Sequence, residues 1–281
     1  MLRQIITFFL LLFGIGKIGK EDEQIDPTGI DPTQQDQSEN PEHQEENQQN
    51  EQPTNMNNQH SKLMVHLDNG HASTTPGKRS PGALIHIGYG NHSAEELSLY
   101  EYEYNRIIVD KVNKRLKDLG FQTYIVTPEV DNDIALTVRA NRSNSMAAKH
   151  PELKHIFVSA HVNACGNGKV WYTGNNASYW AAFTSKGQTA GDKLADCFYD
   201  AAEEILPKYG KHISTEPTDG DRDWEANFTV LTNTNVPATL VESLFMTNVD
   251  DVLFLKSEEG TEAIVEIYVR AICKYFDRYV K

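Results

Sequence analysis

The sequence predicts an α/β domain with a mainly parallel, twisted sheet and helices on both faces. Short apolar runs alternate with amphipathic stretches, which is typical of parallel strands joined by helices. Three apolar runs, residues 64–71, 156–161 and 238–242, end on residues that can bind a metal or carry protons. Because ligands in open α/β sheets bind outside the carboxyl ends of the strands, these runs also predict the active edge of the sheet.

The expected elements follow from hydrophobic periodicity and from residues that end helices. A helix over 101–119 places Ile108, Val112 and Leu116 at four-residue steps and stops at Gly120. Residues 72–100 are rich in Ser, Thr, Pro and Gly, with a short apolar run at 84–87, and predict a long functional loop that could contain a hairpin. Further helices are expected at 133–148, 189–206 and 260–279, and strands at 62–68, 121–127, 155–160, 180–184, 226–232 and 237–242.

The first 60 residues differ in composition from the rest. Residues 5–15 form an apolar run after Arg3, which resembles an export signal, so we expect residues 1–20 to be a signal or anchor-like leader that could attach the chain to a membrane. Residues 21–60 contain eleven Asp or Glu and no Lys or Arg. Such a segment cannot bury enough apolar surface to offset its ordering entropy, which predicts a disordered, acidic, Gln- and Asn-rich linker. Residues 61–281 then form a single catalytic domain.

The charge and the cysteines exclude several classes of function. Most of the formal charge of −14 lies in the acidic linker, and the remaining domain is only mildly acidic. Nucleic-acid binding normally requires a basic face, so we expect no nucleic-acid partner. The three cysteines show no C-x-x-C spacing, which argues against zinc bound by thiolates. We expect a monomer.

Four side chains at the predicted active edge match the requirements of a hydrolytic zinc site. Such a site uses three protein ligands and leaves a position for water, and His71, Glu101 and His161 supply that set. Glu242 follows an apolar strand that would raise its pKa, so it is expected to act as the base. Taken singly, each residue more often serves in a loop, a helix start or an ion pair.

The segments around these residues follow one another in a specific order. They are Leu67-Asp68-Asn69-Gly70-His71, Glu101-Tyr102-Glu103-Tyr104-Asn105, Leu136-Thr137-Val138-Arg139-Ala140-Asn141, Ser159-Ala160-His161-Val162-Asn163-Ala164, Val230-Leu231-Thr232-Asn233-Thr234-Asn235-Val236-Pro237-Ala238-Thr239-Leu240-Val241-Glu242 and Phe245-Met246-Thr247-Asn248. In combination this order resembles the zinc-dependent N-acetylmuramoyl-L-alanine amidases of family 3, over residues 63–275.

The resemblance implies an activity and a role for each candidate residue. His71, Glu101 and His161 match the zinc ligands of that family, one Zn²⁺ per chain, and Glu242 matches its catalytic glutamate. The implied reaction is hydrolysis of the amide between the lactyl group of N-acetylmuramic acid and L-alanine in peptidoglycan. The implied location is extracytoplasmic, in the periplasm or cell wall, as suits either an autolysin or an endolysin.

Rival ligands lie close to Glu101 in the sequence. Glu103 is two residues away, and His92 with Glu95 or Glu96 lies in the preceding loop. Asn105 matches the Asn of the E-x-x-x-N motif and so favours Glu101.

Other functions remain open at this point. The first is another zinc peptidoglycan hydrolase, such as a carboxypeptidase that acts on the stem peptide. The second is a wall-binding module without turnover, although such a module has no need of a base such as Glu242. A purely structural metal site is disfavoured because only three good ligands converge.

Overall fold

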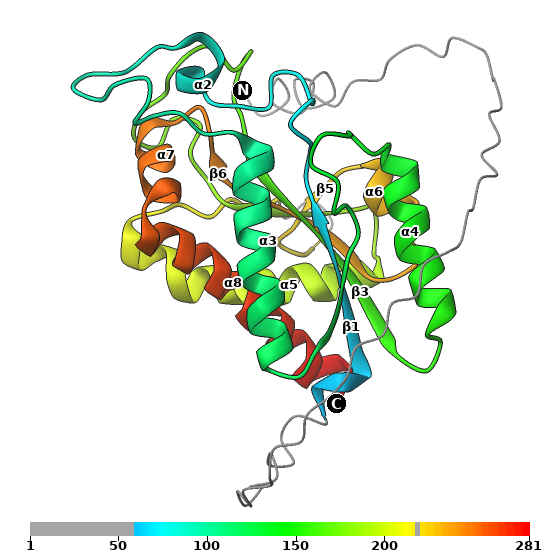
Figure 1. Cartoon of the computed structure of the whole chain (residues 1–281). Coiled ribbons are helices and arrows are strands. Elements are labelled where there is room, and N and C mark those ends of the chain that lie inside the picture. Colours follow the sequence, from blue (N-terminus) through cyan, green and yellow to red (C-terminus); the bar gives the residue numbers. More distant parts are fainter. Residues whose placement is uncertain (1–58, 217–219) are drawn as a thin grey trace, which may run out of the picture. The chain divides into compact units, whose positions relative to one another are not determined.

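The sheet has six strands in the order β2-β1-β3-β6-β4-β5 in a computed structural model that describes residues 59–216 and 220–281. β1 runs parallel to β2 and β3, β3 to β6, and β4 to β5, whereas β4 and β6 are antiparallel. The predicted mainly parallel α/β sheet is therefore confirmed (Figure 1). The strands are β1 (Leu63–Asn69), β2 (Gln122–Ile125), β3 (Lys154–Asn163), β4 (Ala181–Thr184), β5 (Trp224–Glu225) and β6 (Ala238–Phe245).

Helices cover both faces of the sheet. Side chains of a strand alternate between its two sides, so each face carries side chains that a layer of helices can bury. Val65 of β1 packs into the main apolar core, whereas His66 and Asp68 face α4, where they contact Ser143 and Arg139. The helices are α2 (Pro81–Ile85), α3 (Glu101–Asp118), α4 (Leu136–Lys149), α5 (Ala190–Ile205), α6 (Thr229–Thr232), α7 (Val249–Lys256) and α8 (Glu258–Tyr279), with the 3-10 helices η2 (His60–Lys62) and η3 (Leu206–Tyr209).

The main core lies between the sheet and the helices α3, α5 and α8, which pack side by side (Figure 1). Phe198 of α5 meets Tyr268 of α8 edge to face, with ring centroids 5.2 Å apart. Each fully buried large apolar side chain contributes about 1.5–3 kcal/mol. This packing gives the carboxyl ends of β1, β3 and β6 a rigid base.

The charges of α3 explain where this helix begins and ends. Glu101 and Glu103 lie in its first turn, and Arg115 and Lys117 lie in its last turn. Both pairs complement the helix dipole. Gly120, with φ of 89°, follows the C-terminus in the left-handed conformation that terminates many helices. Glu101 is therefore the first residue of a helix that starts at the active edge of the sheet.

Three short elements of the structure differ from what the sequence predicts. The strand predicted at 226–232 is wrong, because residues 229–232 form the helix α6, which packs against α4. The sequence predicts no helix before residue 101, yet Pro81–Ile85 form α2, which Ser80 caps; the expected turn back of the chain within 72–100 is an antiparallel bridge between Tyr89 and His92. The helix α7 was not predicted from the sequence. In each case the run is eight residues or shorter, so contacts with other elements outweigh local propensity.

The predicted leader lies outside the described residues, as does the predicted linker except for its last two residues. Within the part of the chain that the structure describes, we find no helix of the length and apolarity needed to cross a membrane.

Candidate metal centre and active site

His161 and Glu242 are neighbours because of the register of two parallel strands. β3 and β6 pair so that His161 lies beside Glu242, while Ala181 of β4 lies on the other side of Glu242. The register shifts between His161 and Asn163. Such irregularities re-aim side chains at the ends of strands. The two residues, 81 positions apart in the sequence, therefore share the active edge.

His71 and Glu101 reach the same place from other elements. His71 follows the end of β1 with φ of 65°, a left-handed conformation that is uncommon outside glycine. Glu101 opens α3 and is 1% exposed, and its Oε1 accepts hydrogen bonds from the backbone N–H of Val162 and from Nδ1 of His161, both at 3.1 Å. The structure thus brings together all four residues that the sequence singled out.

The three predicted ligands have the spacing of a metal site. Nε2 of His71 lies 3.5 Å from Oε2 of Glu101, and ligand atoms of His71, Glu101 and His161 all lie within 4.8 Å of one another. The two imidazole rings meet edge to face with centroids 4.9 Å apart. Ligands of one zinc ion lie about 3–4 Å apart, so small side-chain movements suffice. Two imidazoles and one carboxylate are also a donor set that suits zinc.

Burial and mutual charge set the protonation of the candidate ligands. Burial lowers the pKa of His71 well below its usual value, against the opposing charge of Glu101. Burial would raise the pKa of Glu101, but the interaction with His71 and then the hydrogen bond from His161 outweigh it and lower that pKa to about 2. A neutral imidazole and an ionised carboxylate are the forms that bind metal.

Glu242 has the opposite electrostatic environment. Burial, and then the charge of Glu101, raise its pKa well above the usual value, while Lys78 acts in the other direction. Its Oε2 is buried and has no hydrogen-bond partner among the residues that the structure describes. A divalent cation bound by Glu101 would oppose both effects and lower the pKa of Glu242. Glu242 is thus suited to gaining and losing a proton.

The rival ligands lie elsewhere. Glu103 is exposed and accepts a hydrogen bond from the hydroxyl of Tyr102, and His92 and Glu96 are exposed partners 4.0 Å apart.

Sequence reasoning missed one neighbour of Glu242. Tyr179 precedes β4, and its pKa is raised by burial and then by the charge of Glu242. The sequence around Tyr179 carries no motif that could have indicated this position.

Comparisons with known proteins agree with the fold. The amidase from Clostridium difficile 630 has a TM-score of 0.58 at 24% identity, and the match covers 78% of this chain and 99% of that chain. Ami1 from Mycobacterium smegmatis, an N-acetylmuramyl-L-alanine amidase, has a TM-score of 0.55 at 18% identity, and the match covers 78% of this chain and 98% of that chain.

A curated relative, an endolysin of Bacillus phage SPP1, is 29% identical over 171 residues. The match covers 59% of this chain and 56% of the relative, so the chain spans little more than half of that relative's length. A family model described as N-acetylmuramoyl-L-alanine amidase matches residues 65–274, which is most of the sequence. By this match the chain belongs to the N-acetylmuramoyl-L-alanine amidase family.

Proposed function

We propose that residues 61–281 form a zinc-dependent amidase that hydrolyses the amide between N-acetylmuramic acid and L-alanine in peptidoglycan. The observation that carries the proposal is the convergence of His71, Glu101 and His161 beside Glu242, in a chain of this family. Family membership supports the amidase reaction, and the donor set supports zinc.

His71, Glu101 and His161 would hold the ion. When bound, zinc lowers the pKa of a coordinated water toward about 7 and polarises a carbonyl group. His71 supplies Nε2, and burial keeps its imidazole in the neutral form that binds metal. Glu101 supplies Oε2, while its Oε1 stays anchored on the backbone N–H of Val162. That anchor fixes the carboxylate before metal binds.

Glu242 would move the proton. Its buried Oε2 takes a proton from the attacking water as the water oxygen bonds to the lactyl carbonyl carbon. The same oxygen then gives the proton to the alanine nitrogen as the carbon–nitrogen bond breaks. The products are a carboxylate on the muramic acid and a free amino terminus on the stem peptide.

The remaining parts of the proposal concern location. Peptidoglycan lies outside the cytoplasm, so the domain would act there, with residues 1–20 as a leader and residues 21–60 as a linker. The name of the phage relative, endolysin, is consistent with action on a cell wall. Fractionation of cells that express the full chain should place it in the membrane or extracytoplasmic fraction, and recovery in the cytoplasm alone would contradict this part.

The activity is tested on the full chain with purified peptidoglycan. We expect new L-alanine amino termini and glycan freed of intact stem peptides, and loss of both after treatment with a chelator. Zinc should restore the activity. Release of D-alanine from stem ends would instead indicate a carboxypeptidase, and tight binding without any product would indicate a wall-binding module.

Two variants and one control assign the roles. Glu242→Gln should keep its zinc and lose about 100- to 10,000-fold in rate, as expected for removal of a general acid–base. His161→Ala should lose zinc itself. Glu103→Gln, an exposed neighbour on α3, is the matched control and should keep both properties. Full hydrolysis by Glu242→Gln would refute the role of the base.

A further inference from the structure

Three successive backbone carbonyls beyond β1 each accept a hydrogen bond from a helix side chain. The carbonyl of Asn69 accepts from Nη1 of Arg139 at 2.9 Å, and the carbonyl of Gly70 accepts from Nδ2 of Asn105 at 3.0 Å. The carbonyl of His71 accepts from Nη1 of Arg106 at 3.0 Å. Arg139 belongs to α4, whereas Asn105 and Arg106 belong to α3. The segment that presents His71 is thus held from two helices on opposite faces of the sheet.

This segment needs such support because of its backbone conformation. His71 has φ of 65°, and a residue with a side chain keeps that conformation only where its surroundings impose it. The adjoining N–H groups are bonded as well. Gly70 donates to the carbonyl of Ala160 at 3.1 Å, and Ala72 donates to Oγ1 of Thr75 at 2.9 Å. The backbone on both sides of the imidazole is therefore fixed.

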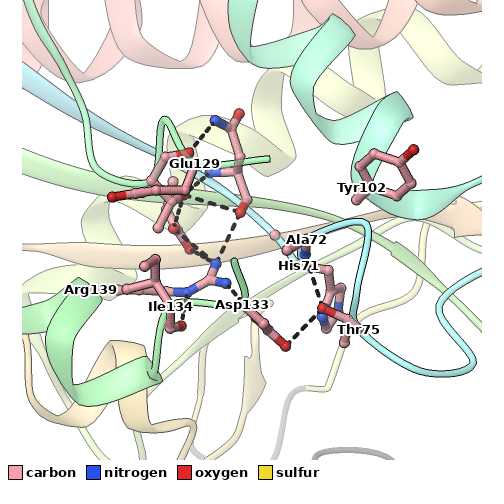
Figure 2. Close-up of polar contacts among 12 residues, drawn as sticks. His71, Ala72, Thr75, Tyr102, Glu129, Asp133, Ile134 and Arg139 are labelled. Atoms are coloured by element: carbon pink, nitrogen blue, oxygen red, sulfur yellow. Dashed lines mark hydrogen bonds and ion pairs between the residues drawn. The ribbon is translucent and has the colours of Figure 1, made fainter. Parts of the chain in front are cut away.

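The helix side chains are themselves held in place. Arg139 is 2% exposed and contacts Asp68 at 3.1 Å. It also contacts Asp133 at 3.1 Å, and Asp133 accepts a hydrogen bond from Thr75 at 2.7 Å (Figure 2). Arg106 donates to the carbonyls of Tyr102, at 2.9 Å, and of Glu129, and its guanidinium lies 5.8 Å from the centroid of the Tyr102 ring. Arg106 thus connects α3, the loop after β2 and the residue that carries the imidazole.

We propose that Arg106 is a positioning residue for the metal centre: it fixes the left-handed backbone of His71 and thereby sets the affinity for zinc. The inference rests on the proposed zinc site. Among the described residues, the structure records no contact between Arg106 and the other two proposed ligands, Glu101 and His161. Its recorded hydrogen bond to a proposed ligand residue goes to the carbonyl of His71. Groups that orient metal ligands in this way typically change metal affinity by about 10- to 100-fold when removed.

The experiment compares Arg106→Gln and Arg106→Lys with Arg115→Gln in the full-length protein. Arg115 lies on the same helix and pairs with Glu266 of α8, away from the centre. Zinc affinity is measured by competition with a chromophoric chelator, and the cobalt-substituted protein is examined by visible absorption. The thermal midpoint of the metal-free protein reports the stability of the fold.

For Arg106→Gln we expect zinc affinity about 10- to 100-fold weaker and an altered cobalt spectrum, with hydrolysis recovering as zinc is raised. Arg106→Lys keeps a charged donor and should recover part of the affinity. Arg115→Gln should change the thermal midpoint without changing zinc affinity. If both Arg106 variants bind zinc as tightly as the wild type, the inference is overturned while the zinc site stands.

Other outcomes separate the inference from the proposed function. Should the wild type hold no zinc, the proposed metal centre falls and the inference falls with it. If Arg106→Gln fails to fold, Arg106→Lys decides, because it replaces the two-pronged guanidinium with a single ammonium donor. In that case, folded Arg106→Lys with wild-type affinity and spectrum would overturn the inference.

Discussion

At the residue scale, Gly70 leaves no room for a side chain beside the candidate metal centre. A Cβ at this position would lie 2.5 Å from the carbonyl oxygen of Ala160 and 2.5 Å from Cε1 of His161. Neither atom can yield easily, since the first is strand backbone and the second belongs to a predicted ligand. The absence of a side chain at Gly70 thus lets β1 and β3 meet beside the candidate metal centre.

Gly70→Ala should therefore weaken zinc binding by about tenfold or more and destabilise the fold by about 1–3 kcal/mol, the usual range for overpacking. Chelator competition and urea unfolding measure the two effects. Gly77→Ala is the control: Gly77 has φ of 74°, with open space around its Cβ position, so it adds backbone strain without crowding. Equal zinc affinities for the two variants would contradict this account.

A second residue-scale feature is the buried His66. It hydrogen bonds through Nδ1 to Ser143 at 2.7 Å and through Nε2 to Nδ1 of His155 at 3.0 Å. Nε2 of His155 lies 2.9 Å from the carbonyl of His150, which can only accept, so this nitrogen carries the proton. His66 then donates to His155 and accepts from Ser143, which is the pattern of a neutral imidazole.

Burial, and then the repulsion that would arise from His155 if both rings were protonated, lower the pKa of His66 from 6.5 to about 3. Between these values the unfolded chain binds a proton that the folded chain does not, so stability falls as pH falls from 6.5 toward 3. The loss approaches about 1.4 kcal/mol per pH unit for one proton. Urea unfolding of wild type and of His66→Asn, from pH 7 to pH 4.5, should show a shallower dependence for the variant. Parallel curves would argue against this proton linkage.

At the scale of elements, α7 shows how one side chain caps a short helix and connects it to a neighbouring loop. Oδ1 of Asn248 accepts a hydrogen bond from the N–H of Asp251 at 3.2 Å. Its Nδ2 donates to the carbonyls of Gly174 and Asn176, each at 3.0 Å. One side chain therefore caps α7 and ties the loop before β4 to the end of β6.

Asn248→Ala should destabilise the protein by about 2–4 kcal/mol, because loss of a cap removes about 1 kcal/mol and each buried hydrogen bond about 1 kcal/mol. Asn248→Asp keeps the oxygen that caps the helix and loses the amide N–H groups that bind Gly174 and Asn176. This variant therefore separates the contribution of the cap from that of the two loop hydrogen bonds. Both are measured by denaturant unfolding. A change below about 0.5 kcal/mol for Asn248→Ala would refute the role given to this side chain.

At the scale of the whole molecule, the proposed zinc site joins three parts of the fold. Its ligands come from the segment after β1, from the start of α3 and from β3. A ligand that binds only the folded state stabilises it by about 2.7 kcal/mol at 100 times its dissociation constant. Bound zinc should thus act as a cross-link between elements that unfolding separates.

Zinc should raise the thermal midpoint of the full chain, and His161→Ala should lose most of this rise. Magnesium, which prefers oxygen ligands, should have little effect on either protein. Differential scanning calorimetry with and without each ion provides the measurement. Equal zinc-induced shifts in the wild type and in His161→Ala would place the zinc elsewhere.

Periodicity and motif order predict the fold class and the four candidate site residues in advance. The apolar runs ending at His71, His161 and Glu242 predict strands because burial on both faces imposes such runs on parallel strands, and β1, β3 and β6 confirm them. Asn105 in the E-x-x-x-N motif likewise favours Glu101 over Glu103, and Glu101 is the acid that lies beside the two histidines. These features are local in sequence, so sequence alone can indicate them.

Only the tertiary structure decides what depends on contacts between distant residues. Residues 229–232 carry the branched side chains of a strand, yet packing against α4 makes them the helix α6. The left-handed turn at His71 depends on Arg106, 35 positions away, and the sequence records no such pairing. Propensity describes a residue and its neighbours along the chain, whereas these choices follow from hydrogen bonds and packing that exist only once the sheet and helices have assembled.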